Sequence, residues 1–192
     1  MLSKNRRSVV LGLSFGLALP SVALAQSDSA IIEKRMQVRE MARDALSTLY
    51  EVNPAARFAI EHAAGFGVFS TFGLKFLFAG GTTGKGVVVN NRTHRETFMR
   101  MVGAQAGLGF GAQSNRLVFV FETHSALRNF IEQGWEFGAQ GNVAATLSDQ
   151  GAMMSGALSV APGVFVYQIT STGLAAQLTL SGTKYFKDDE LN

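Results

Sequence analysis

The stretch AGGTTGKGVVV, Ala79 to Val89, can be interpreted as a phosphate-binding loop or as a connection within a β-sheet, and the choice decides the predicted fold. Its glycines, threonines and Gly-Lys pair are similar to a phosphate-binding loop. That motif needs Gly, four residues, Gly-Lys and then Ser or Thr, whereas this stretch begins with Ala79 and has Gly86 at the last position. Strand-like runs, Leu74–Phe78 and Gly86–Asn90, flank it, while a phosphate loop opens a helix. The stretch therefore predicts a glycine-rich connection between two strands and argues against nucleotide binding.

The sequence pattern changes from helix-like to strand-like near Ala64. Before this point, apolar residues recur three and four positions apart over residues 29–50, which predicts an amphipathic helix. Pro54 suits the start of a second helix over residues 54–63. The first helix either packs on a core or lies on a membrane surface. Its apolar face comprises Val38, Met41, Ala42, Ala45, Leu46 and Leu49.

After Ala64, glycine-rich strand-like runs follow one another, and one good helix interrupts them, over residues 125–133. Because long crossover helices are missing, the sheet should be mainly antiparallel. Gly107, Gly109 and Gly111 share one face of a strand, which predicts tight curvature or a close approach of the backbone. We expect an α+β fold, with N-terminal helices packed on a strongly bent or barrel-like, mainly antiparallel β-sheet. The expected strands are Gly67–Thr71, Leu74–Phe78, Gly86–Asn90, Gln105–Ala112, Leu117–Glu122, Ala139–Ala145, Val164–Thr170 and Leu174–Tyr185.

Residues 1–25 have the three parts of a secretory signal. A basic head precedes an apolar run over residues 9–19, and the small-residue motif Ala23-Leu24-Ala25 follows, so cleavage is expected after Ala25. The Arg6-Arg7 pair also fits a twin-arginine signal, and both export routes remain open. We expect a periplasmic or extracellular protein, peripheral on a membrane. Residues 26–192 should form a single domain with a helical N-terminal part over residues 29–63.

Charge is uneven along the chain, which has 17 basic and 14 acidic residues in all. Removing the signal takes away Lys4, Arg6 and Arg7 and no acidic residue, which leaves a formally neutral remainder and no case for nucleic-acid binding. Residues 66–100 concentrate positive charge, and the N-terminal helix carries a basic row at i, i+4 and i+8. These basic residues are Lys75, Lys85, Arg92, Arg95 and Arg100 in the first group and Arg35, Arg39 and Arg43 in the second.

Motifs for catalysis and cofactors fail in their context. GLGFGA, Gly107–Ala112, matches the dinucleotide fingerprint, but a strand follows it where a helix is required. GLSFG, Gly12–Gly16, matches a nucleophile elbow but lies inside the signal. The three histidines, His62, His94 and His124, share no metal-ligand spacing. We therefore expect no catalytic residue, no metal, no cofactor and no nucleotide.

The order and spacing of several segments resemble the SYLF domain family, the Ysc-type lipid- and actin-binding domain. AAGFGVF, residues 63–69, is similar to the start of the family's first strand, and FLFAGGTTGKGVVV, residues 76–89, is similar to its paired-glycine hairpin. Residues 103–123 resemble its central glycine-rich strand pair, residues 137–145 the following strand, and residues 166–189 its closing hairpin. The glycines at family positions are Gly80, Gly81, Gly84, Gly86, Gly173 and Gly182.

The resemblance implies a non-enzymatic lipid-binding domain. Eukaryotic relatives bind phosphoinositides and actin-linked partners, neither of which is expected in a bacterial periplasm, so affinity for anionic membrane phospholipids is the part that transfers. Thr83 and Lys85 differ from the aromatic and acidic residues that the family commonly has there. We expect the eight basic residues named above to meet lipid phosphates. The alternative is a small integral outer-membrane β-barrel or structural envelope protein, although three tyrosines and one tryptophan are few for aromatic girdles.

Overall fold

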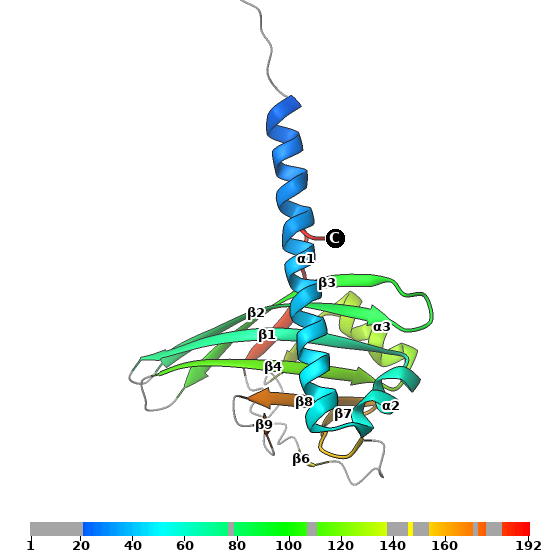
Figure 1. Ribbon diagram of the computed structural model, residues 1–192. Helices are drawn as coiled ribbons and strands as arrows, with labels where there is room; N and C mark the ends of the chain where they lie inside the picture. The colour runs from blue at the N-terminus through cyan, green and yellow to red at the C-terminus, as the bar shows by residue number, and fades with distance from the viewer. Residues whose placement is uncertain are drawn as a thin grey trace, which may run out of the picture.

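The computed structural model describes residues 21–76, 79–106, 111–137, 146–147, 154–170, 173–175 and 182–192. Over these ranges the chain is an α+β protein in which helices lie on both faces of one curled sheet (Figure 1). The helices are α1 (Ser21–Val52), α2 (Ala55–His62) and α3 (His124–Gln133). The strands are β1 (Gly65–Phe76), β2 (Ala79–Asn90), β3 (Glu96–Ala106), β4 (Gly111–Phe121), β5 (Trp135–Phe137), β6 (Thr146–Leu147), β7 (Leu158–Ala161), β8 (Val164–Thr170), β9 (Gly173–Leu174) and β10 (Thr183–Lys187).

The sheet has the order β5-β10-β3-β2-β1-β4-β8-β7-β6, and β9 pairs with β8. Each pairing over the described residues is antiparallel, which confirms the predicted sheet type. The four long strands β1 to β4 form its centre, and the sheet curls around α3 (Figure 1). We call the concave side of the sheet, which packs against α3, the inner face, and the side that α1 crosses the outer face.

The stretch from Ala79 to Val89 lies within β2 and is not a connection, so that prediction is wrong. Its backbone pairs with β1 on one side and β3 on the other along its whole length. Glycine weakens a strand through entropy, but pairing on both edges satisfies the backbone N–H and C=O groups at every position. The two short strands predicted over residues 67–71 and 74–78 are likewise one strand, β1.

The predicted strand Gln105–Ala112 is also wrong, since its two ends belong to different strands, β3 and β4. Sequence analysis missed most of β3, as well as β5, β6 and β7, while β8 was predicted with its observed bounds. The predicted strand Leu174–Tyr185 is wrong as one strand, since its ends belong to β9 and β10. The strand predicted over residues 139–145 lies outside the described residues. Helices α1, α2 and α3 confirm the three predicted helices, although α1 starts eight residues before the predicted start.

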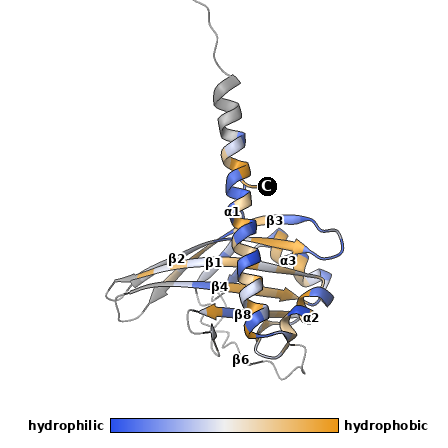
Figure 2. Cartoon of the chain, in the orientation of Figure 1, coloured by the Kyte–Doolittle hydropathy of each residue, from blue (hydrophilic) through white to orange (hydrophobic). Residues whose placement is uncertain are grey.

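The outer face packs against α1 and α2. Val38, Ala42, Ala45 and Leu49 are buried on α1, which confirms the predicted apolar face, and Met41 and Leu46 are partly buried beside them. Small alanine side chains allow the helix axis to approach the strands closely. Figure 2 shows the resulting alternation of hydrophobic and hydrophilic residues along α1. On the sheet, the outer-face core includes Val68, Val87, Phe98, Val118, Val120, Phe165, Tyr167 and Ile169.

The inner face is aromatic and packs around α3. The ring of Phe130 on α3 lies 5.3 Å from Phe119, 4.9 Å from Phe121 and 5.4 Å from Tyr185, centroid to centroid. Phe69 on β1 lies 5.0 Å from Tyr185 in an edge-to-face arrangement. Such aromatic contacts contribute about 0.5 to 1.5 kcal/mol each beyond the burial of area. The cluster therefore holds strands distant in the sheet order around one helix.

Glycine on β2 makes room for this cluster. A Cβ on Gly86 would lie 2.3 Å from the carbonyl oxygen of Val68 and 2.4 Å from Cδ1 of Phe69, and one on Gly84 would lie 2.8 Å from the Ser70 oxygen. The backbones of β1 and β2 therefore leave no room for a side chain at these two positions. Gly81 has open space around it, since the nearest atom to a Cβ is 3.9 Å away.

The other predicted structural glycines differ in backbone conformation and in their position in the sheet. Gly173 and Gly182 have positive φ angles of 117° and 71°, a region that glycine adopts at little cost. Gly80 lies in β2 and Gly111 begins β4. Gly107 and Gly109, on which curvature was predicted, lie outside the described residues.

Substituting Gly86 with Ala should destabilise the fold by about 1 to 3 kcal/mol, because the added methyl group overpacks the β1–β2 contact. Gly81→Ala on the same strand is the matched control and should be neutral or slightly stabilising, as the unfolded chain loses entropy. Urea unfolding followed by circular dichroism measures both. Equal stabilities for the two variants would show that the close approach at Gly86 is not needed.

Candidate functional site

Two of the predicted lipid-binding residues on α1 make contacts within the protein. The guanidinium groups of Arg35 and Arg39 lie over the ring of Phe98, 5.8 Å and 5.4 Å from its centroid. Arg39 Nε donates to Glu96 Oε2 at 2.8 Å, and Arg35 Nε donates to the carbonyl of Leu191 at 2.8 Å. These contacts fasten α1 to β3 and to the C-terminal residues. Lipid binding by Arg35 and Arg39 stays a prediction.

Arg43, the third member of the row, is exposed one turn further along α1. Within the described part of the chain, its side chain has no recorded hydrogen bond or ion pair. Lys75 lies in β1, and its side chain is outside the described part of the structure. The basic residues predicted to act together thus fall into separate environments.

Lys85 and Arg100 lie side by side on the outer face, because β2 and β3 pair in a register that places them opposite each other. The same register continues through Ser70 to Arg116 on β4, so three cationic residues share one row. Arg100 Nε lies 4.0 Å from the largely buried Asp188 carboxylate. Lys34, which hydrogen-bonds Glu190, is the main cause of a lowered pKa for that carboxyl, and Lys85 and Arg100 add to it. The cationic row therefore lies beside the acidic residues Asp188 and Glu190.

Exposed apolar side chains lie beyond this cationic row on the same face. Phe72 and Leu74 on β1 alternate with inward-pointing neighbours, and Val102 on β3 lies in the same cross-strand row as Phe72. Lys184 on β10 is opposite Val102. We call these residues the outer-face patch: Phe72, Leu74, Val102, Lys85, Arg100, Arg116 and Lys184. Sequence analysis missed its apolar members, although the period-two alternation from buried Val68 to residues 70, 72 and 74 could have shown them.

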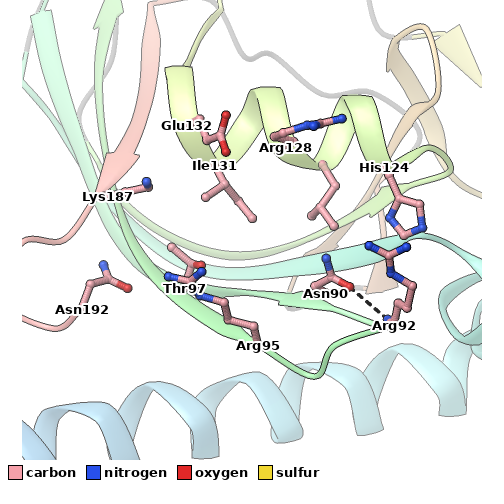
Figure 3. Close-up of a pocket in the computed structure, with 11 residues that line it drawn as sticks. Asn90, Arg92, Arg95, Thr97, His124, Arg128, Ile131, Glu132, Lys187 and Asn192 are labelled. Carbon is pink, nitrogen blue, oxygen red and sulfur yellow. Dashed lines mark hydrogen bonds between the residues drawn. The ribbon is translucent and has the colours of Figure 1, made fainter.

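Arg92 and Arg95 lie elsewhere, in the turn between β2 and β3, which Figure 2 shows as hydrophilic. They line a cavity of about 550 Å³ between this turn and α3, with Arg128 and Lys187 (Figure 3). We call this cavity the α3 pocket. Its lining residues are Asn90, Arg92, Arg95, Thr97, His124, Leu127, Arg128, Ile131, Glu132, Lys187 and Asn192. Arg128 and Lys187 were missed because they are distant in sequence from the basic stretch.

The turn that carries the two arginines is held by hydrogen bonds. The Asn90 side-chain oxygen accepts from the backbone N–H of Arg92 at 3.0 Å and of Thr93 at 3.1 Å. The backbone N–H of Asn90 donates to the Arg95 carbonyl at 3.0 Å. These bonds fix the backbone positions of Arg92 and Arg95.

The outer-face patch and the α3 pocket lie on opposite faces of the sheet, and the apolar end of the patch is distant from the pocket along the strands. Phe72 pairs with Thr83, and the pocket begins at Asn90 further along β2. At about 3.3 Å per residue this stretch spans roughly 23 Å. The cationic residues of the two surfaces are closer: Lys184 of the patch and Lys187 of the pocket are three residues apart on β10 and point to opposite faces. The sheet itself therefore separates the two cationic surfaces.

A curled antiparallel sheet with helices on both faces defines an α+β protein that presents two cationic surfaces. No three His, Asp or Glu side chains among the described residues gather to hold a metal ion. Nor does any described helix combine the length and apolarity needed to cross a membrane.

Comparison with known proteins agrees with this class. The sequence model of the Ysc84 family, described as a Las17-binding protein actin regulator, matches residues 102–192. Beta cell expansion factor A of Aeromonas veronii is 32% identical over 160 residues, which cover 83% of this chain and 59% of that protein. The chain belongs to the SYLF (Ysc84) domain family, as its segments predicted. Membership suggests lipid- or actin-related binding. The aligned part spans 59% of the length of the Aeromonas veronii protein.

Replacing Arg39 with Gln should lower the free energy of unfolding by about 1 kcal/mol, because it removes a half-exposed ion pair and a cation–π contact. Arg43→Gln on the same helix is the control and should change stability by less than about 0.5 kcal/mol. Thermal and urea unfolding measure the difference. A loss as large in the Arg43 variant would show that the contacts of Arg39 do not anchor α1.

Proposed function

We propose that the protein is an exported, non-enzymatic binding protein that associates with anionic phospholipid head groups at a membrane surface. The observation that carries the proposal is the outer-face patch, where exposed Phe72, Leu74 and Val102 lie beside a row of cationic side chains. Large apolar side chains held in water favour a partner that removes them from it. The combination of apolar and cationic groups fits the interface of an anionic bilayer.

Both parts of the patch contribute to the expected affinity. A cationic side chain near an anionic surface contributes about 1 kcal/mol. Lys85, Arg116 and Lys184 lie on this face, together with Arg100, which is also 4.0 Å from the Asp188 carboxylate. Full burial of a Phe or Leu side chain contributes about 1.5 to 3 kcal/mol, and roughly half of that remains to be gained at half-exposed positions. The sum supports reversible, peripheral binding that weakens with salt, because added ions screen the charges.

Replacing Phe72 and Leu74 together with Ser should reduce binding to anionic vesicles about tenfold, because the apolar contribution is lost. Phe58→Ser is the matched control, since Phe58 on α2 is 48% exposed and Phe72 is 49% exposed. Co-sedimentation with phosphatidylglycerol vesicles at low salt measures both variants, and phosphatidylcholine vesicles provide the neutral comparison. Absence of wild-type binding to the anionic vesicles, or an equal loss in the Phe58 variant, would contradict the proposal.

Export is supported by the signal pattern at residues 1–25 and places the protein in the periplasm or outside the cell. The mature protein should begin at Gln26, which follows the small-residue motif. Mass spectrometry of the protein purified from the periplasmic or secreted fraction measures its first residue. Recovery of the chain from the cytoplasm alone, with residues 1–25 intact, argues against export.

A further inference from the structure

The α3 pocket carries an inference that does not depend on membrane binding. We propose that this pocket binds a small, soluble molecule bearing a phosphate group, a phosphomonoester. Arg92 and Arg95 from the β2–β3 turn, Arg128 from α3 and Lys187 from β10 bring four cationic side chains to one cavity. Figure 3 shows these elements enclosing the space from different sides.

Positive charge in the pocket is only partly offset by the protein itself. Glu132 is the acidic side chain among the described lining residues. Within the described ranges, no ion pair is recorded for the four cationic side chains, whereas Lys34, Arg39 and Arg57 each have one. Four cationic side chains that share a cavity with Glu132 leave an excess of positive charge, and a bound anion relieves their mutual repulsion. The pocket therefore favours an anionic ligand.

The donor groups suit phosphate in particular. Arginine presents a planar fork of N–H donors that matches phosphate oxygens two at a time, and lysine adds a compact positive charge. His124, in the first turn of α3, lies across from Arg92 (Figure 3). The Thr97 hydroxyl lies in the same lining. A tetrahedral anion can accept hydrogen bonds from several of these directions.

The size and lining of the pocket indicate more than a bare ion. A volume of about 550 Å³ lies within the range of small-molecule sites, about 300 to 1,000 Å³. Leu127 and Ile131 from α3 supply an apolar wall beside the cations. A phosphate attached to a short organic group would use both surfaces, which is why the structure assigns a phosphomonoester.

The walls are held in place before any ligand arrives. The backbone N–H of His94 donates to the Asn90 carbonyl at 2.8 Å, within the turn that the Asn90 side chain also stabilises. Lys187 is placed by the pairing of β10 with β3, opposite Met99. Because the backbone of the walls is already fixed, a small ligand needs to order only the side chains around it.

The position of the pocket distinguishes a soluble ligand from a lipid head group. It lies on the inner face, while the outer-face patch lies on the other side of the sheet and further along the strands. A bilayer in contact with Phe72 and Leu74 cannot place its head groups between α3 and the β2–β3 turn. The ligand must therefore reach the pocket from solution.

Isothermal titration calorimetry of the purified protein with inorganic phosphate and with glycerol 3-phosphate tests the proposal. We expect both to bind, glycerol 3-phosphate more tightly, and Lys187→Gln or Arg92→Gln to weaken binding about fivefold to tenfold. Lys184→Gln is the matched control, because Lys184 is three residues away on β10 and faces outward. This variant should bind both probes as the wild type does, while losing affinity for anionic vesicles.

The outcomes of the two assays separate this proposal from the membrane proposal. Phosphate binding that is lost in Lys187→Gln and kept in Lys184→Gln supports the pocket, whatever the vesicles show. No binding of either probe, or equal loss in both variants, overturns it. Binding seen with phosphatidic acid vesicles and lost in Lys187→Gln, without binding of glycerol 3-phosphate, also overturns it in favour of a lipid head group. Circular dichroism confirms that each variant is folded.

Discussion

The ring of Phe69 lies against the backbone of Gly86, where any larger residue would place a Cβ atom 2.4 Å from it. The missing side chain lets the ring of Phe69 lie over β2, where it contacts Phe119, Phe130 and Tyr185. The sheet curls because its inner face closes around these rings and the helix that carries Phe130. The position of α3, and with it one wall of the pocket, depends on this arrangement.

Because the sheet is curled, its two faces have different surroundings. The inner face is filled by α3, so that cationic groups from a turn, a helix and a late strand meet at its rim. The outer face is covered by α1 only in part, because the helix crosses the strands and leaves their far ends bare (Figure 1). Phe72 and Leu74 are exposed for that reason. One sheet thus presents an apolar and cationic surface on one side and a cationic cavity on the other.

Much of the architecture could be predicted from local patterns. The spacing of Val38, Ala42, Ala45 and Leu49 predicted α1 because a helix repeats every 3.6 residues whatever surrounds it. The antiparallel sheet followed from the lack of crossover helices. Most of β3 was missed, because its start is polar and charged and its burial comes from α1 and the C-terminal turn on one face and from the aromatic cluster on the other. Those neighbours are distant in sequence, as the bonds of Asn192 to Phe98 show.

The sequence by itself determined the α+β class, the helices, the family and which residues carry positive charge. Only the tertiary structure decided how that charge is used. Arg39 is paired with Glu96, Lys85 lies beside an apolar surface, and Arg92 lines a cavity with Lys187. The physical reason is that local sequence sets helix and strand periodicity, whereas the partner of a charged side chain depends on strand register and on which helix covers which face. The glycines of β2 connect the two levels, since they permit the curl that brings these partners together.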